Sequence, residues 1–228
     1  MVNQDCKKAS GKIQEENEDL DIVYFTDPLC CWSWAMKPQL ARLRADWKGT
    51  IRWRYCMGGL LPSWNQFTDS VNSINRPAQM GPIWMQAAQL TDVPIPHSIW
   101  IKDPPASSYP ACIAVKCAML QSPALGELYL HFIQEAIMIH RLNIAKYEVL
   151  QQVAEQVTAA ASCFDVSRFL DDMNNGNGLE AFRKDIQEVK YRTINRFPTL
   201  LIRRTAQVPL LITGYKPAGV LMSIIMQS

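Results

Sequence analysis

The residues best suited to chemistry lie together in the segment Asp27-Pro-Leu-Cys30-Cys31-Trp32-Ser33-Trp34, between a predicted buried strand and a predicted helix. Cys30 falls at the N-cap or first position of that helix. Unpaired backbone N–H groups and the positive end of the helix dipole favour an anion at this place. Such a position lowers the pKa of a cysteine, and the thiolate is the nucleophilic form. We therefore predict that Cys30 is a reactive thiol.

Neighbouring side chains are expected to support Cys30 rather than to replace it. Trp32 and Trp34 offer apolar contact to a substrate or shield the site. Asp27 precedes a proline, which is typical of a turn, and we favour this role over proton exchange with Cys30. Cys31 is expected to point into the packing of the helix.

The other thiols and imidazoles favour packing or surface roles. Seven cysteines are an odd number, which excludes complete pairing within one chain. Cys112 and Cys117 are five residues apart on a predicted helix with no histidine nearby, so they are poor zinc ligands. The remaining residues of these types show no catalytic spacing: Cys6, Cys56, Cys163, His97, His131 and His140. We predict no metal site.

The elements that position Cys30 follow from hydrophobic periodicity. Residues 21–25 form a short apolar run that predicts a buried strand. One apolar helix face comes next: Met36, Leu40, Leu43 and Trp47. Residues 51–57 alternate between apolar and basic side chains, as in a strand with one exposed face. Strand, helix and strand in so short a span indicate a βαβ unit with parallel strands.

A long helical region separates this unit from a second pair of strands. Residues 60–110 are rich in Pro, Trp and Met, with one short helix expected at 83–92, and the period from about 108 to 192 is helical. Two apolar runs follow, at 199–202 and 209–213, and they predict a hairpin. A final helical pattern covers residues 216–226. The order β-α-β, helical block, β-β-α indicates an α/β fold.

Composition limits the class of protein further. The 228 residues are 48% hydrophobic and 19% charged, which excludes wholesale disorder, and a net charge of +2 argues against a strongly basic nucleic-acid binder. No run approaches the ~18 apolar residues of a membrane span. The first twenty residues lack the apolar core of a signal peptide, so we expect a solvated tail at 1–20 and a cytoplasmic protein with reduced cysteines.

These features resemble the DsbA-like branch of the thioredoxin superfamily, over nearly the whole chain. Three segments carry the resemblance: residues 27–34, Arg196-Phe197-Pro198-Thr199 before a strand, and Thr213-Gly-Tyr-Lys-Pro217 before the last helix. The resemblance implies a thioredoxin fold with a large all-helical insertion between its βαβ and ββα halves. The corresponding thioredoxin-like domain comprises residues 21–60 and 193–228. The helical insertion domain comprises residues 61–192.

The resemblance also implies a substrate-binding loop. In this family the proline before the third strand is cis and lies against the active-site cysteine, and Pro198 matches that position. The backbone beside it, here at Phe197, pairs with extended peptide or with glutathione. The basic stretch that ends at Arg196 favours a solvated helix face, but Arg196 itself precedes this loop, where it can help to hold a carboxylate such as that of glutathione.

The sequence departs from the family at one catalytic position. Aligned on Cys30 the motif reads Cys-Cys-Trp-Ser, so Ser33 stands where the C-x-x-C motif has its second cysteine. That cysteine releases the partner from a mixed disulfide, which Ser33 cannot do. Cys31 is a poor substitute because a disulfide between neighbours is strained. We expect a protein thiol-disulfide oxidoreductase or isomerase that works through Cys30 alone, with Ser33 supporting the thiolate and glutathione or another thiol resolving the adduct.

Two alternatives stay open. Kappa-class glutathione transferases and 2-hydroxychromene-2-carboxylate isomerases share the fold, with a Ser-Pro-Tyr-Ser-Trp segment whose serine activates glutathione, but Cys30 takes the place of that serine. The Trp- and Met-rich residues 53–100 then line a second-substrate groove, although packing between the two lobes explains them equally well. The third class is a non-catalytic module that binds client peptides. All three imply protein or small-thiol partners, and neither nucleic acid nor membrane.

Overall fold

The computed structural model describes residues 19–67, 69, 73–205 and 207–227. Its strands are β1 (Leu20–Thr26), β2 (Ile51–Met57), β3 (Thr199–Arg203) and β4 (Leu210–Thr213). Its helices are α1 (Cys31–Asp46), the 3-10 turn η1 (Pro77–Gln79), α2 (Met80–Thr91), α3 (Ile99–Lys102), α4 (Tyr109–Gln121), α5 (Pro123–Met138), α6 (Tyr147–Ala160), α7 (Val166–Asn174), α8 (Asn177–Tyr191) and α9 (Ala218–Gln227). Residues 1–18, which include Cys6 and most of the tail expected at 1–20, lie outside the described residues. Leu20, at the end of the expected tail, belongs to β1.

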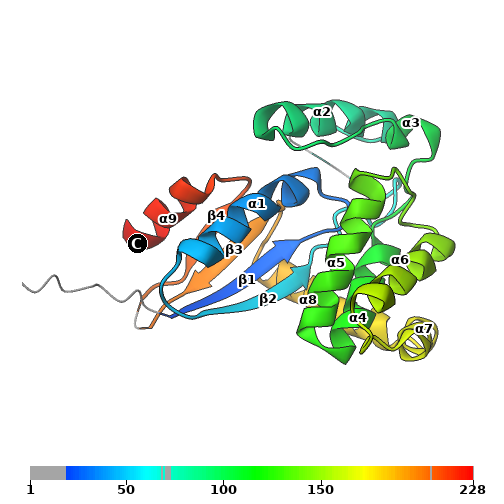
Figure 1. Cartoon of the computed structure of the whole chain (residues 1–228). Coiled ribbons are helices and arrows are strands. Elements are labelled where there is room, and N and C mark those ends of the chain that lie inside the picture. Colours follow the sequence, from blue (N-terminus) through cyan, green and yellow to red (C-terminus); the bar gives the residue numbers. More distant parts are fainter. Residues whose placement is uncertain (1–18, 68, 70–72, 206, 228) are drawn as a thin grey trace, which may run out of the picture.

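A four-stranded sheet in the order β2-β1-β3-β4 forms one half of the molecule (Figure 1). β1 and β2 are parallel, with Tyr24 beside Tyr55, so the predicted βαβ unit is confirmed. β3 is antiparallel to β1 and also to β4, which confirms the predicted hairpin. This order places β1 in the interior of the sheet, with its carboxyl end leading directly to Cys30.

The two faces of the sheet are covered by different helices. α1 and α9 pack on one face through an apolar cluster that includes Ile22, Met36, Leu200 and Leu221. On the other face Val23 and Leu201 pack with Val189 of α8. Because side chains alternate along a strand, β1 and β3 need apolar residues at nearly every position to fill both faces.

All helices from η1 to α8 lie between β2 and β3 in the chain, and they share a second core. Trp84, Trp100, Tyr129 and Phe169 are fully buried there. The ring centroids of Trp84 and Trp100 are 5.1 Å apart at a near-perpendicular angle, the favoured edge-to-face arrangement. These two tryptophans therefore pack in the core of the helical region and do not line an open groove.

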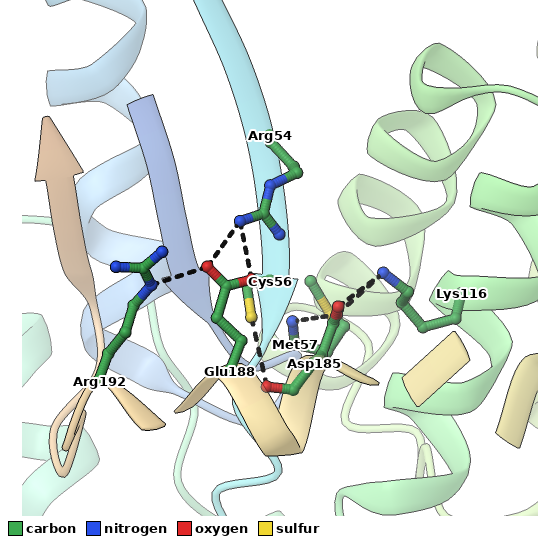
Figure 2. Close-up of polar contacts among 7 residues, drawn as sticks. All are labelled: Arg54, Cys56, Met57, Lys116, Asp185, Glu188 and Arg192. Atoms are coloured by element: carbon green, nitrogen blue, oxygen red, sulfur yellow. Dashed lines mark hydrogen bonds and ion pairs between the residues drawn. The ribbon is translucent and has the colours of Figure 1, made fainter. Parts of the chain in front are cut away.

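A polar cluster joins edge strand β2 to the helical region (Figure 2). Asp185 of α8 accepts hydrogen bonds from the Met57 N–H at 2.7 Å and from Lys116 of α4 at 3.0 Å. Glu188, one turn further along α8, receives two hydrogen bonds of 2.8 Å from Arg54. The buried Asp185 thus fixes the end of β2, which leads into the glycine pair beside the Pro198 loop.

Candidate active site

Cys30 is the N-cap residue of α1, as predicted from the sequence. Its N–H donates to the Asp27 carbonyl at 3.0 Å, and its carbonyl accepts the first helical hydrogen bond from the Trp34 N–H at 3.1 Å. Its backbone angles, φ −83° and ψ 108°, are extended, and its side chain does not cap the helix. The thiol is therefore free to point toward the neighbouring strand loops.

The Cys30 thiol meets the loop before β3. Cys30 Sγ donates to the Phe197 carbonyl oxygen at 3.4 Å, and the peptide bond between Phe197 and Pro198 is cis. Ser33 is completely buried one turn along α1, and its Oγ has no hydrogen-bond partner among the described residues. The structure thus brings together four predicted site residues, Cys30, Ser33, Phe197 and Pro198.

The predicted lowering of the Cys30 pKa is wrong. The side chain is only 5% exposed, and burial raises the pKa of the Cys30 thiol to about 11. Ser33 and the backbone N–H groups at the start of α1 act in the opposite direction and favour the thiolate. Desolvation outweighs them because a buried anion loses its hydration. In this closed arrangement Cys30 is a protonated thiol.

Close packing fixes the loop that faces Cys30. A Cβ atom added to Gly58, directly after β2, would lie 2.3 Å from the Phe197 ring, so only glycine leaves room for this ring. The Gly214 N–H donates to the Pro198 carbonyl at 2.8 Å, and the Thr199 hydroxyl donates to the Arg196 carbonyl at 2.8 Å. These contacts hold the carbonyl of Phe197 in place opposite the thiol.

Asp27 has a wider role than the predicted turn. Its Oδ1 accepts from the Leu29 N–H at 2.8 Å, which is the expected turn contact. Its Oδ2 accepts from the Leu60 N–H at 2.6 Å, from Ser108 Oγ at 2.9 Å and from Cys112 Sγ at 3.3 Å. Asp27 is completely buried, and burial raises its pKa while these donors lower it. The carboxyl group therefore links β1 to the helical region beneath Cys30.

The remaining predicted site residues lie around this centre in different directions. Trp32 and Tyr215 face each other with ring centroids 6.3 Å apart. Trp34 stacks on His131 of α5, with centroids 6.5 Å apart, and so faces the helical region. Arg196 is exposed just before Phe197, and Cys31 packs into the helical core as expected.

The other described thiols are unpaired as well. Cys31, Cys56, Cys112 and Cys117 are buried, and Cys163 is exposed. Within the described part of the chain, no three His, Cys, Asp or Glu side chains are grouped to hold a metal ion. The helices described there are also too short or too polar to cross a membrane.

Sequence reasoning missed one polar group near this site. Lys37 Nζ lies 2.6 Å from His131 Nδ1, although the two residues are 94 positions apart. The sequence shows no catalytic spacing for this histidine and favours a packing or surface role. The only local signal was Trp34 and Lys37 three residues apart on one helix, a spacing that places them on the same face.

Similarity in sequence points to a family of bacterial proteins. The chain is 26% identical over 219 residues to the ClpXP adapter protein SpxH of Halalkalibacterium halodurans, and the match spans 95% of this chain and 70% of that relative. The match to SpxH of Bacillus subtilis, 24% identical over 188 residues, spans 82% of this chain and 59% of the relative. This chain therefore spans only part of the length of these relatives.

Several solved structures share the fold of this chain. A putative protein disulfide isomerase from Nitrosomonas europaea superimposes with a TM-score of 0.75 at 20% identity, covering 92% of this chain and 97% of that one. The cytosolic disulfide reductase DsbM from Pseudomonas aeruginosa, also solved with GSH, gives 0.67 at 18% identity, covering 91% and 100%. A 2-hydroxychromene-2-carboxylate isomerase gives 0.61 at 14% identity, covering 91% and 95%.

These neighbours confirm the fold expected from the sequence, a thioredoxin fold with a helical insertion. A family model described as Thioredoxin matches residues 24–222, which include Cys30, Pro198 and the whole helical region. The chain belongs to the thioredoxin family.

Proposed function

We propose that this protein is a DsbA-like monothiol exchange protein, which captures partner proteins as mixed disulfides at Cys30. The observation that carries the proposal is the contact of Cys30 Sγ with the Phe197 carbonyl beside a cis proline, with Ser33 in place of a second thiol. A partner segment that pairs with the Phe197 backbone would lie directly over Cys30.

The exchange step needs no redox cofactor. The Cys30 thiolate attacks one sulfur of a partner disulfide, the partner S–S bond breaks, and a Cys30–partner disulfide forms. The second partner sulfur leaves as a thiolate and takes up a proton. A further thiol, from glutathione or from the partner itself, then attacks the mixed disulfide and releases Cys30.

Ionisation of Cys30 is the controlling event in this proposal. Burial holds the pKa of the thiol at about 11, so few molecules carry a thiolate at neutral pH. A docked partner that takes over the Phe197 carbonyl would turn the thiol toward Ser33, whose buried hydroxyl has an unused donor. Hydrogen bonds to a thiolate favour it, so docking and activation are coupled.

Glutathione is the small thiol that we propose for resolution. Arg196 is exposed one residue before Phe197 and carries a charge that suits a glutathione carboxylate. The similar DsbM structure with GSH and the unpaired state of the six described cysteines support this choice and a cytoplasmic location.

A second candidate function is that of a protein-binding adapter without turnover. The observation that favours it is the similarity to the ClpXP adapter protein SpxH along 95% of this chain. The raised pKa of Cys30 and the missing second thiol agree with binding rather than rapid catalysis. In this case the Phe197 loop and the surrounding surface hold a protein destined for ClpXP.

Mixed-disulfide trapping tests the first proposal. The chain, with Cys6 and exposed Cys163 replaced by serine, is incubated with glutathione disulfide and followed by intact mass. We expect one glutathionyl group on Cys30 and none after Cys30→Ser. Ser33→Cys should convert the adduct into an internal disulfide, with loss of the glutathionyl group. A persistent adduct in Ser33→Cys, or labelling that survives Cys30→Ser, contradicts the proposal.

Activity assays separate the alternatives. Reduction of insulin in the presence of glutathione should depend on Cys30 if the chain turns over disulfides. Pull-down of a ClpXP substrate that is unchanged by Cys30→Ser would support the adapter. Glutathione conjugation that survives Cys30→Ser would instead indicate a transferase of the kappa or isomerase type.

A further inference from the structure

The contact between α1 and α5 contains a lysine, a histidine and a glutamate in line. Lys37 Nζ lies 2.6 Å from His131 Nδ1, and His131 Nε2 lies 3.6 Å from Glu135 Oε1. The Trp34 ring supports this group, because Lys37 Nζ lies 4.7 Å from its centroid and the His131 ring stacks beside it. α1 and α5 are in contact, and the Lys37–His131 pair joins the two helices.

The short contact between Lys37 and His131 requires an acceptor nitrogen. Two protonated nitrogens at 2.6 Å would direct hydrogen atoms and positive charges at each other. Burial and the Lys37 charge lower the pKa of His131, and burial lowers the pKa of Lys37 to about 8. His131 Nδ1 is therefore the acceptor while Lys37 is protonated, and with a pKa of about 8, about a tenth of Lys37 is the uncharged amine at pH 7.

The charged groups around this pair are few. Glu135 and Glu127 of α5 face Lys37 and act to raise its pKa. Glu127 is already engaged by Arg44 of α1 at 2.7 Å. Glu135 lies 3.6 Å from the other ring nitrogen, Nε2, and so favours the orientation of the imidazole with Nδ1 toward the lysine.

A nucleophile within hydrogen-bond reach of a base, with the base oriented by a third group, is the general signature of an activated nucleophile. We propose that Lys37 is a nucleophilic amine, with His131 as its base and Glu135 as the positioning residue, and that it accepts acyl groups from thioesters. This site is separate from Cys30 and does not depend on the function proposed above.

The acyl transfer balances without a further reactant. The uncharged Lys37 amine attacks the thioester carbonyl, a C–N bond forms, and the C–S bond breaks. The nitrogen passes its proton to His131 Nδ1, and the leaving thiolate then takes up this proton. The products are an amide on Lys37 and a free thiol, and no electron is transferred to or from the protein.

Access and surface chemistry fit a short acyl group. The side chains of His131 and Glu135 are 42% and 34% exposed and Lys37 is half-buried beside them, so the site borders on solvent. Trp34 and Phe132 border the lysine and the histidine with apolar rings. An aliphatic acyl chain would cover these rings, whereas a charged one would lose hydration against them.

Competitive acetylation with S-acetyl-N-acetylcysteamine tests the proposal, with peptide mass spectrometry as the readout. The full chain carries Cys30→Ser, which removes acyl transfer through that thiol, and the exposed Lys48 is the internal reference. At pH 7.5 we expect Lys37 to react about ten-fold or more faster than Lys48, since a lowered pKa leaves more amine uncharged. The rate should rise with pH to a midpoint near 8.

Two variants distinguish general-base assistance by His131 from the effect of burial on Lys37 alone. His131→Phe keeps a ring beside Trp34 and should slow Lys37 about five-fold or more, by loss of general-base assistance. Glu135→Gln should lower both the plateau rate and the pH midpoint, because Glu135 raises the pKa of Lys37. Circular dichroism checks that each variant is folded. Labelling of Lys37 no faster than that of Lys48, or at the unchanged rate in folded His131→Phe, overturns the proposal.

Discussion

The Cys30 thiol donates a hydrogen bond to the Phe197 carbonyl at 3.4 Å and so joins the start of α1 to the loop before β3, 167 residues further along the chain. A thiolate has no proton to donate, so this contact belongs to the protonated form alone. In the function proposed above, this carbonyl would bind a partner backbone, and here it is occupied by the nucleophile itself. Under that proposal, partner binding and release of the thiol would be one event.

Alkylation of Cys30 should be slow at mildly alkaline pH. The pKa of the buried thiol is raised to about 11, against ~8.5 for an unperturbed cysteine, so the thiolate fraction at pH 8 falls by about two orders of magnitude. Iodoacetamide labelling followed by peptide mass spectrometry gives the rate at each site. The exposed Cys163 is the comparison within the same chain. Equal labelling rates for Cys30 and Cys163 at pH 8 would contradict this prediction.

Gly58→Ala should release the loop that covers Cys30. The added Cβ would lie 2.3 Å from the far end of the Phe197 ring, so this ring must move, and we expect its movement to loosen the loop over the thiol. We expect a loss of about 1–3 kcal/mol in the free energy of unfolding, as in other overpacked sites. Alkylation of Cys30 should become faster.

Gly219→Ala provides the matched control for this variant. Nothing lies within 4 Å of the added Cβ in α9, and alanine forms helix better than glycine. Its free energy of unfolding should stay equal or rise, with the Cys30 alkylation rate unchanged. Similar loss of stability in both variants would mean that the Phe197 contact is not the cause.

The parts of this fold that depend on local pattern were predictable. The alternation at 51–57 and the apolar run at 21–25 became β2 and β1 because β2 has one solvated face over most of its length and β1 is buried on both faces. Cys30 was placed at the N-cap because the strand ends and the helix begins within a few residues. The predicted helix at 83–92 instead begins at Met80, after a proline-initiated 3-10 turn.

The electrostatics of the site were not predictable, because they depend on contacts across the chain. The Cys30 pKa is raised by burial under the Phe197 loop, whereas the sequence shows only the helix start that lowers it. Asp27 Oδ2 accepts a hydrogen bond from Ser108, 81 residues further along the chain, and Lys37 contacts His131, 94 residues further along. A local sequence pattern does not predict which distant residue will be the partner.

Lys116→Met should destabilise the protein because it removes the ion-pair partner of the buried Asp185. Asp185 has a side chain only 7% exposed, and without Lys116 its buried carboxylate would keep the Met57 N–H but lose its positively charged partner. Loss of one partner of a buried pair costs about 3–5 kcal/mol. Arg54→Met, in the more exposed pair with Glu188, should cost less than about 1 kcal/mol. Urea unfolding of the two variants measures the contrast, and comparable losses would contradict it.

Lys37→Met should change how stability depends on pH. Burial lowers the pKa of Lys37 from 10.5 to about 8, so between these values the unfolded chain binds more protons than the folded chain. The free energy of unfolding of the wild type should therefore rise, relative to Lys37→Met, as the pH increases through this window. Urea unfolding at several pH values from 7.5 to 10.5 measures the difference, and Lys48→Met serves as the exposed control. Parallel curves for the wild type and Lys37→Met would show that Lys37 keeps an ordinary pKa in solution.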